Sequence, residues 1–128
     1  DHIFADLKII DSDAHKKYTG VGNERIKTNL KWLLGSKKAE NVVIRTPLIP
    51  GMTTSEENIA GIAKFISDIY PDVKYELLNY NPLAQGKYEM IDKKFCYEDN
   101  PPLYSDDQMR AFGKIATDNG VKNLLLEI

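Results

Sequence analysis

The 128-residue sequence contains a single cysteine, Cys96, and only two histidines. One thiol cannot form an internal disulfide, and by itself it cannot hold an iron–sulfur cluster or a zinc ion. No apolar run approaches the ~20 residues of a transmembrane helix, and the N-terminus lacks the layout of a signal peptide. We therefore expect a cytoplasmic protein that does not associate with membranes.

Neither sign of charge is in large excess, because the net charge is −2, and no long basic run is present. Such a chain provides no general field for binding nucleic acid or an anionic membrane. The sequence also has no G-x-G-x-x-G, no phosphate-binding P-loop, no serine nucleophile elbow and no zinc spacing. With 42% hydrophobic and 28% charged residues, it is typical of one globular domain or a piece of one.

Four segments have the composition and periodicity of β-strands, at residues 3–11, 41–49, 73–79 and 121–128. The first alternates with a period of two: Ile3, Ala5, Leu7 and Ile9 share one side, and Phe4, Asp6, Lys8 and Ile10 share the other. At about 3.3 Å of rise per residue, these two charges lie about 6.6 Å apart. A charged pair on a buried strand is costly to desolvate unless it is paired or binds a ligand, and both uses are open here.

Three amphipathic helices are expected between the strands, bounded by Asn23 and Gly35, by Thr54 and Pro71, and by Ser105 and Gly120. Asn23 can cap the first, and capping boxes at residues 54–57 and 105–108 open the other two. Alternating strands and helices with right-handed crossovers predict an α/β protein with a parallel sheet. The connection at residues 80–104 is long, and connections of that length are often functional.

Polar residues gather where the predicted strands end. Active sites of parallel α/β sheets lie at the carboxyl ends of the strands, and Asp6, Lys8, Arg45, Asn79 and Asn81 belong to that end. Arg45 is either paired with an acid, Asp6 being a candidate, or presented to an anionic ligand group. By themselves these residues indicate a small-ligand site with an acid, an ammonium and a guanidinium, and they specify no reaction.

Four blocks of sequence carry a family resemblance: DLKIID at residues 6–11, HKKYTGVGNERI at 15–26, IRTPLIPGMT at 44–53 and YELLNYNPLAQGKY at 75–88. In this order and at these distances, they resemble the C-terminal half of the glycyl radical enzyme activating enzymes, such as pyruvate formate-lyase activating enzyme. The resemblance covers the chain from Asp1 to about Gly120. It implies half of a partial (β/α)6 TIM-like barrel, with about four strands and three main helices.

The same resemblance implies a radical S-adenosylmethionine enzyme, an oxidoreductase. A site-differentiated 4Fe–4S cluster cleaves the cofactor reductively in this family, and the 5′-deoxyadenosyl radical abstracts a hydrogen from a backbone glycine of a pyruvate formate-lyase-like partner. The cluster-binding C-x-x-x-C-x-x-C belongs to the N-terminal half of the family and is absent from this sequence. The chain also starts without a methionine, so we expect residues 1–128 to be a single fragment that is inactive and retains neither cofactor.

The resemblance assigns roles to four residues. Asp6 and Lys8 match the family's D-x-K at the end of the central barrel strand, which implies contacts to S-adenosylmethionine, with the Asp near a monovalent cation in some members. Arg45 matches the arginine of the R-x-x-x-x-P-G block, which also lines the cofactor pocket. Asn81 stands where the pyruvate formate-lyase activator has a histidine close to the ribose, and an amide can still hydrogen-bond there. We expect all four to bind the cofactor, none to act as an acid–base catalyst, and none to ligate a metal.

Two other interpretations remain open. One is an unrelated α/β barrel enzyme in which Lys8 is a desolvated amine poised for Schiff-base chemistry. The other is a non-catalytic interaction domain that uses the open sheet. Borohydride trapping with carbonyl ligands tests the first, and the gene sequence upstream of Asp1 separates all three.

Cutting a barrel leaves exposed surfaces, so the fragment is expected to self-associate. The strand at residues 3–11 loses its neighbour on one side, and a long apolar edge without proline recruits other chains. The sheet face that lined the barrel is opened as well, and Phe4, Val43 and Leu77 are expected to form an apolar patch on it.

The single cysteine generates a first test. One thiolate cannot replace the three ligands of a site-differentiated cluster, so we expect the chain neither to carry a cluster nor to cleave S-adenosylmethionine. Anaerobic reconstitution followed by iron and sulfide analysis measures this. Stoichiometric iron and sulfide with a 4Fe–4S spectrum would contradict the expectation.

Overall fold

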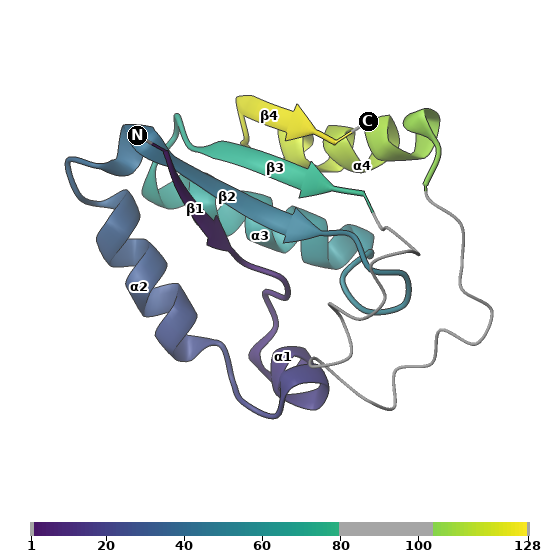
Figure 1. The fold of residues 1–128 in the computed structure, drawn as a ribbon, viewed down its shortest axis with the longest axis horizontal. Coiled ribbons are helices and arrows are strands. Elements are labelled where there is room, and N and C mark those ends of the chain that lie inside the picture. Colours follow the sequence, from purple (N-terminus) through teal and green to yellow (C-terminus); the bar gives the residue numbers. More distant parts are fainter. Residues whose placement is uncertain (1, 80–103, 128) are drawn as a thin grey trace.

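The computed structural model describes residues 2–79 and 104–127. Its elements in chain order are β1 (Ile3–Asp6), α1 (Ser12–Thr19), α2 (Glu24–Leu34), the 3-10 helix η1 (Ala39–Asn41), β2 (Val42–Pro47), α3 (Glu56–Ile69), β3 (Lys74–Leu78), α4 (Asp106–Asp118) and β4 (Asn123–Leu126). The strands form one parallel sheet in the order β1-β2-β3-β4 (Figure 1). The predicted α/β class with four parallel strands is confirmed, and a partial barrel is consistent with it. The predicted long connection lies, except for Tyr104, outside the described residues.

The main core lies between the sheet and helices α2, α3 and α4, and α3 runs behind β2 and β3 in Figure 1. Side chains alternate along each strand, so every second residue of β2 and β3 points into this core. Ile44, Tyr75 and Leu77 are fully buried there. The facing helix residues, likewise buried, are Leu30, Leu34, Ile59, Ile62, Ala63, Ile66, Met109 and Ala116.

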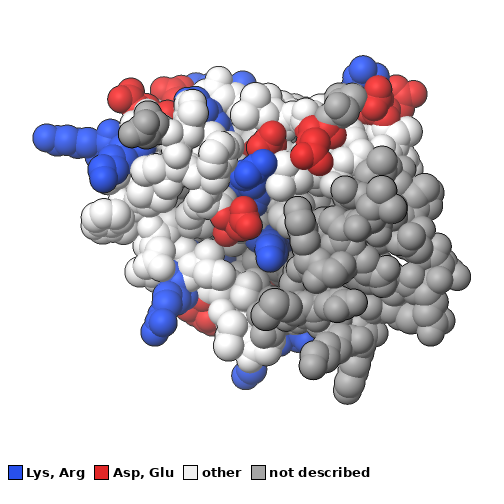
Figure 2. Space-filling model, in the orientation of Figure 1, with Lys and Arg blue, Asp and Glu red and all other residues white. Residues whose placement is uncertain are grey.

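The other set of alternate side chains forms what we call the helix-free face, since no helix of the described part covers it (Figure 1). Its members line a shallow hollow of about 340 Å³ and are His2, Phe4, Val43, Arg45, Lys74, Glu76 and Leu125. Figure 2 views the molecule from this side and shows basic and acidic side chains next to one another near its middle. The two faces of the sheet therefore differ in chemistry, one apolar and one mixed.

The first strand is shorter than predicted, since β1 ends at Asp6 rather than at Asp11. Leu7 N still donates to Arg45 O at 3.0 Å, but the next backbone groups leave the ladder. Ile10 N and the carbonyl of Lys8 bind the side chain of Asn58 instead. Because those groups have side-chain partners, they do not continue the strand.

The predicted helix signals hold with two corrections. Ser105 and Gln108 form the expected capping box at the start of α4. At the start of α3, however, the cap is Ser55 rather than Thr54, and its Oγ accepts from Asn58 N at 3.0 Å, so the box predicted at residues 54–57 was wrong. Asn23 precedes α2 but makes no side-chain capping bond there, because its amide binds elsewhere.

The predicted apolar patch is only partly exposed. Phe4 is 58% exposed and Leu125 is 46% exposed, whereas Val43 is 4% exposed and Leu77 is fully buried. The prediction for Leu77 was wrong because the register pairs Glu76 with Arg45, which turns Leu77 toward the helices. None of the described helices is long and apolar enough to cross a membrane.

We expect the isolated chain to form a dimer or larger assembly through the helix-free face or the free edge of β1. Replacing Leu125 by Lys should weaken a face-to-face assembly by about tenfold, because a charge would have to be desolvated in the interface. Sedimentation at micromolar concentration measures the effect. Trp32→Ser, which removes an aromatic that is 73% exposed on α2, is the control. A monomeric wild-type chain that unfolds cooperatively would contradict the prediction.

Candidate functional site

Three of the four predicted site residues lie at the carboxyl ends of β1 and β2. Asp6 is the last residue of β1, and its register partner in β2 is Arg45. Lys8 follows two residues later, where the alternation of burial continues: Leu7 and Ile9 are buried, and Lys8 is half-buried. The fourth residue, Asn81, lies outside the described residues.

Asn79, also expected at this end, has a structural role. Its side-chain amide donates to Tyr104 O at 2.9 Å and its Oδ1 accepts from Tyr104 N at 3.0 Å. This pair of bonds joins the end of β3 to the residue that leads into α4. The amide is therefore fully engaged with the backbone.

The acid that pairs with Arg45 is Glu76, not Asp6. Arg45 Nε donates to Glu76 Oε1 at 2.9 Å, and its guanidinium carbon lies 4.7 Å from the centre of the Phe4 ring. Within the described residues the ion pairs are this one and Asp107–Arg110, so Asp6 and Lys8 do not form the structural pair considered from their spacing. Asp6 is exposed. Its carboxylate and the Lys8 ammonium thus have no ionic partner in the described part of the chain.

The backbone that carries Lys8 is held by an unusual set of contacts. Four consecutive carbonyl groups, those of residues 7–10, each accept a hydrogen bond from a side chain. Thr46 Oγ1 donates to Leu7 O at 2.6 Å, and Asn58 Nδ2 donates to Lys8 O at 2.8 Å. Asn23 Nδ2 donates to the carbonyls of Ile9 and Ile10 at 2.8 and 2.9 Å.

Two of these donors are themselves braced. Tyr75 is fully buried and donates to Thr46 Oγ1 at 2.7 Å. Burial raises the pKa of the Tyr75 phenol, so its O–H remains a donor. Asn58 also accepts from Ile10 N at 2.8 Å and donates to Thr53 O at 2.9 Å, which ties the segment after β1 to the turn after β2.

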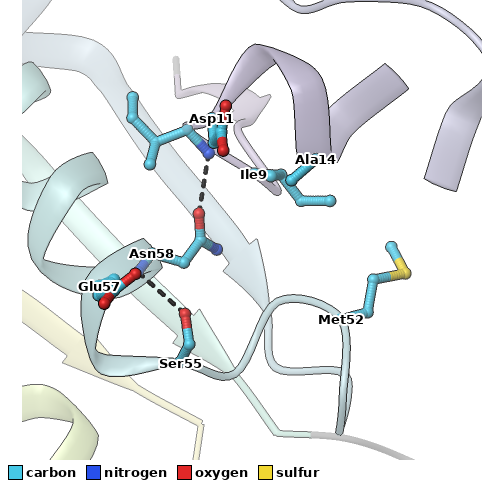
Figure 3. Close-up of a pocket in the computed structure, with 8 residues that line it drawn as sticks. Ile9, Asp11, Ala14, Met52, Ser55, Glu57 and Asn58 are labelled. Atoms are coloured by element: carbon cyan, nitrogen blue, oxygen red, sulfur yellow. Dashed lines mark hydrogen bonds between the residues drawn. The ribbon is translucent and has the colours of Figure 1, made fainter. Parts of the chain in front are cut away.

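Asn58 also borders a hollow of about 300 Å³ between α1 and the N-terminus of α3 (Figure 3). The hollow is lined by Ile9, Ile10, Asp11, Ala14, Met52, Ser55, Glu57 and Asn58. Figure 3 shows the Asn58 side chain reaching across to the backbone of the segment after β1, while Ser55 Oγ accepts a hydrogen bond from the backbone N–H of Asn58. The polar side chains that line it are thus partly occupied in holding the backbone.

No protein-family model matches the chain. Indoleacetate decarboxylase activating enzyme of Tractidigestivibacter scatoligenes is 39% identical over 126 residues, which cover 98% of this chain and 39% of that protein. Choline trimethylamine-lyase activating enzyme of Oleidesulfovibrio alaskensis is 39% identical over 109 residues, covering 82% and 34%. A crystal structure of a domain of pyruvate-formate lyase-activating enzyme from Bacteroides vulgatus matches with a TM-score of 0.68 at 26% identity, covering 98% of this chain and 66% of that one.

The chain is homologous to part of the glycyl radical enzyme activating enzymes. The resemblance expected from its four sequence blocks is therefore confirmed. The chain spans less than half the length of the curated relatives it matches. In the described part of this activating-enzyme homologue, no group of three His, Cys, Asp or Glu residues is arranged to hold a metal ion.

Sequence reasoning missed four residues that organise the site of this activating-enzyme homologue. Glu76 shares a side of its strand with Lys74, and this alternation places its charge on one face of the sheet without indicating its partner. Asn23, Thr46 and Asn58 are polar residues beside apolar stripes, and all three are buried. A polar residue at a buried position indicates a specific hydrogen-bond partner, although not which one.

Replacing Asn58 by Ala should lower the free energy of unfolding by about 2–3 kcal/mol. The substitution leaves Ile10 N and the carbonyls of Lys8 and Thr53 without their partner, and a buried unsatisfied group costs ~1–3 kcal/mol. Urea unfolding followed by circular dichroism measures the change. Asn29→Ala, at an exposed position of α2, is the control and should stay within about 0.5 kcal/mol. Equal stabilities of the two variants would show that water replaces the Asn58 amide without cost.

Proposed function

We propose that residues 1–128 are the C-terminal half of a glycyl radical enzyme activating enzyme and supply part of its S-adenosylmethionine site. One observation carries the proposal: Asp6 and Arg45 are register partners on adjacent strands and Lys8 follows Asp6 by two residues, in a chain whose homologues are activating enzymes. Asn81 is proposed as a fourth contact. The partner would be a pyruvate formate-lyase-like glycyl radical enzyme.

The chemistry of these groups suits the cofactor. S-adenosylmethionine carries a carboxylate, an ammonium, a sulfonium and ribose hydroxyls. Lys8 and Arg45 can donate charge-assisted hydrogen bonds to the carboxylate, and Asp6 can accept from the ammonium or a hydroxyl. Together with a 4Fe–4S cluster, the bound cofactor would supply the radical chemistry that acts on a glycine of the partner. The residues of this chain bind and orient it.

The cluster ligands would come from the remainder of the enzyme, because this sequence offers only the thiol of Cys96. The two rival functions are less well supported. An unrelated Schiff-base enzyme requires a desolvated amine, and Lys8 is only half-buried. Homology to activating enzymes also argues against a purely non-catalytic interaction domain.

In the full-length enzyme, Lys8→Ala should weaken S-adenosylmethionine binding by about 1.5–3 kcal/mol, which is roughly ten- to 150-fold, through loss of a charge-assisted bond. Titration calorimetry with the cluster intact measures the affinity. Lys122→Ala, which removes an exposed ammonium just before β4, is the control for net charge. If both variants bind as tightly as the wild type, Lys8 does not contact the cofactor.

A further inference from the structure

Glu76 and Arg45 face each other across neighbouring strands of the helix-free face. They are register partners between β2 and β3, and Glu76 Oε1 accepts from Arg45 Nε at 2.9 Å. Their side chains are 21% and 31% exposed. The pair is partly open to water, and solvent screening limits what it contributes to folding stability.

The geometry of the contact suits orientation. Glu76 binds the guanidinium in its plane through Nε, and the Phe4 ring lies against it at 4.7 Å. These two contacts restrict the planar group in two different directions. Neither uses the terminal nitrogens Nη1 and Nη2, and within the described residues those nitrogens have no hydrogen-bond partner. No described residue therefore occupies the two-pronged edge of the guanidinium, which can bind a carboxylate in bidentate fashion.

We propose that Glu76 is a positioning residue, which orients the Arg45 guanidinium so that its terminal nitrogens bind S-adenosylmethionine. This inference rests on the proposed cofactor site. Glu76 itself does not touch the ligand. Its carboxylate acts only through Arg45, with Phe4 as the second support.

If Glu76 orients Arg45, removing it changes the affinity for a ligand carboxylate in the direction opposite to that expected from electrostatics alone. A carboxylate beside an arginine reduces the local positive potential, so if Glu76 acted only as a charge, its removal would strengthen binding of a ligand carboxylate or leave it unchanged. If Glu76 orients Arg45, its removal frees the guanidinium, and the ligand must then immobilise that side chain at a cost in entropy. Binding is weakened in that case.

The test uses the full-length enzyme with its cluster, and titration calorimetry with S-adenosylmethionine. Glu76→Val removes the acceptor but keeps a residue that suits a strand, and it should weaken binding by about three- to tenfold. Glu76→Gln retains an oxygen that can accept from Nε, and its affinity should stay within about twofold of the wild type. Glu40→Ala removes an exposed carboxylate in η1 and controls for net charge. Melting temperatures of all variants confirm that each is folded at the temperature of the titration.

A double-mutant cycle separates the inference from the function on which it rests. In an Arg45→Ala background, Glu76→Val should have no further effect on affinity, because the residue through which Glu76 acts is gone. If Arg45→Ala binds the cofactor as well as the wild type, the proposed role of Arg45 fails. If Arg45→Ala weakens binding while Glu76→Val leaves it unchanged or tighter, the site stands and the positioning role of Glu76 is overturned. An effect of Glu76→Val that persists without Arg45 also overturns it.

Discussion

The feature on which the site depends is the set of side chains that bind the carbonyls of residues 7–10. Strand pairing would normally satisfy such groups, and a buried carbonyl without a partner is costly. Here three side chains replace the hydrogen bonds of a neighbouring strand: Thr46 from β2, Asn58 from α3 and Asn23 from the start of α2. The segment can therefore leave the sheet directly after β1 with all four of these carbonyls hydrogen-bonded.

These hydrogen bonds fix the backbone that carries Lys8, one of the candidate site residues. Lys8 lies in the middle of the held segment, so its Cα is positioned by bonds to the backbone on both sides. Asn58 reaches in addition to Thr53 O, in the turn that follows β2, the strand that carries Arg45. The three donors thus set where Lys8 lies relative to Arg45. Any ligand that binds both cations meets a backbone that is already ordered, which lowers the entropy lost on binding.

Much of the fold could be predicted from the sequence, because the signals involved are local. The alternation of residues 3–9 correctly gave the buried side of the first strand, and Ser105 with Gln108 correctly gave the start of α4. The end of β1 could not be predicted in this way, since it depends on Asn58, about fifty residues away in the sequence. The partner of Arg45 was equally out of reach. Asp6 and Glu76 are both its register neighbours, and only the rotamers in the folded chain decide between them.

The two faces of the sheet differ in the side chains that they carry. A sheet that packs against two apolar layers would bury hydrophobic residues on both faces, as in ordinary doubly covered parallel sheets. Here Ile44, Tyr75 and Leu77 are fully buried toward the helices, whereas Arg45 and Glu76 occupy the same strands on the opposite side and stay partly open to water. Charges at the centre of a sheet are tolerated where they pair with one another or meet a polar ligand. On the helix-free face Arg45 and Glu76 meet the first of these conditions, because they pair with each other across neighbouring strands.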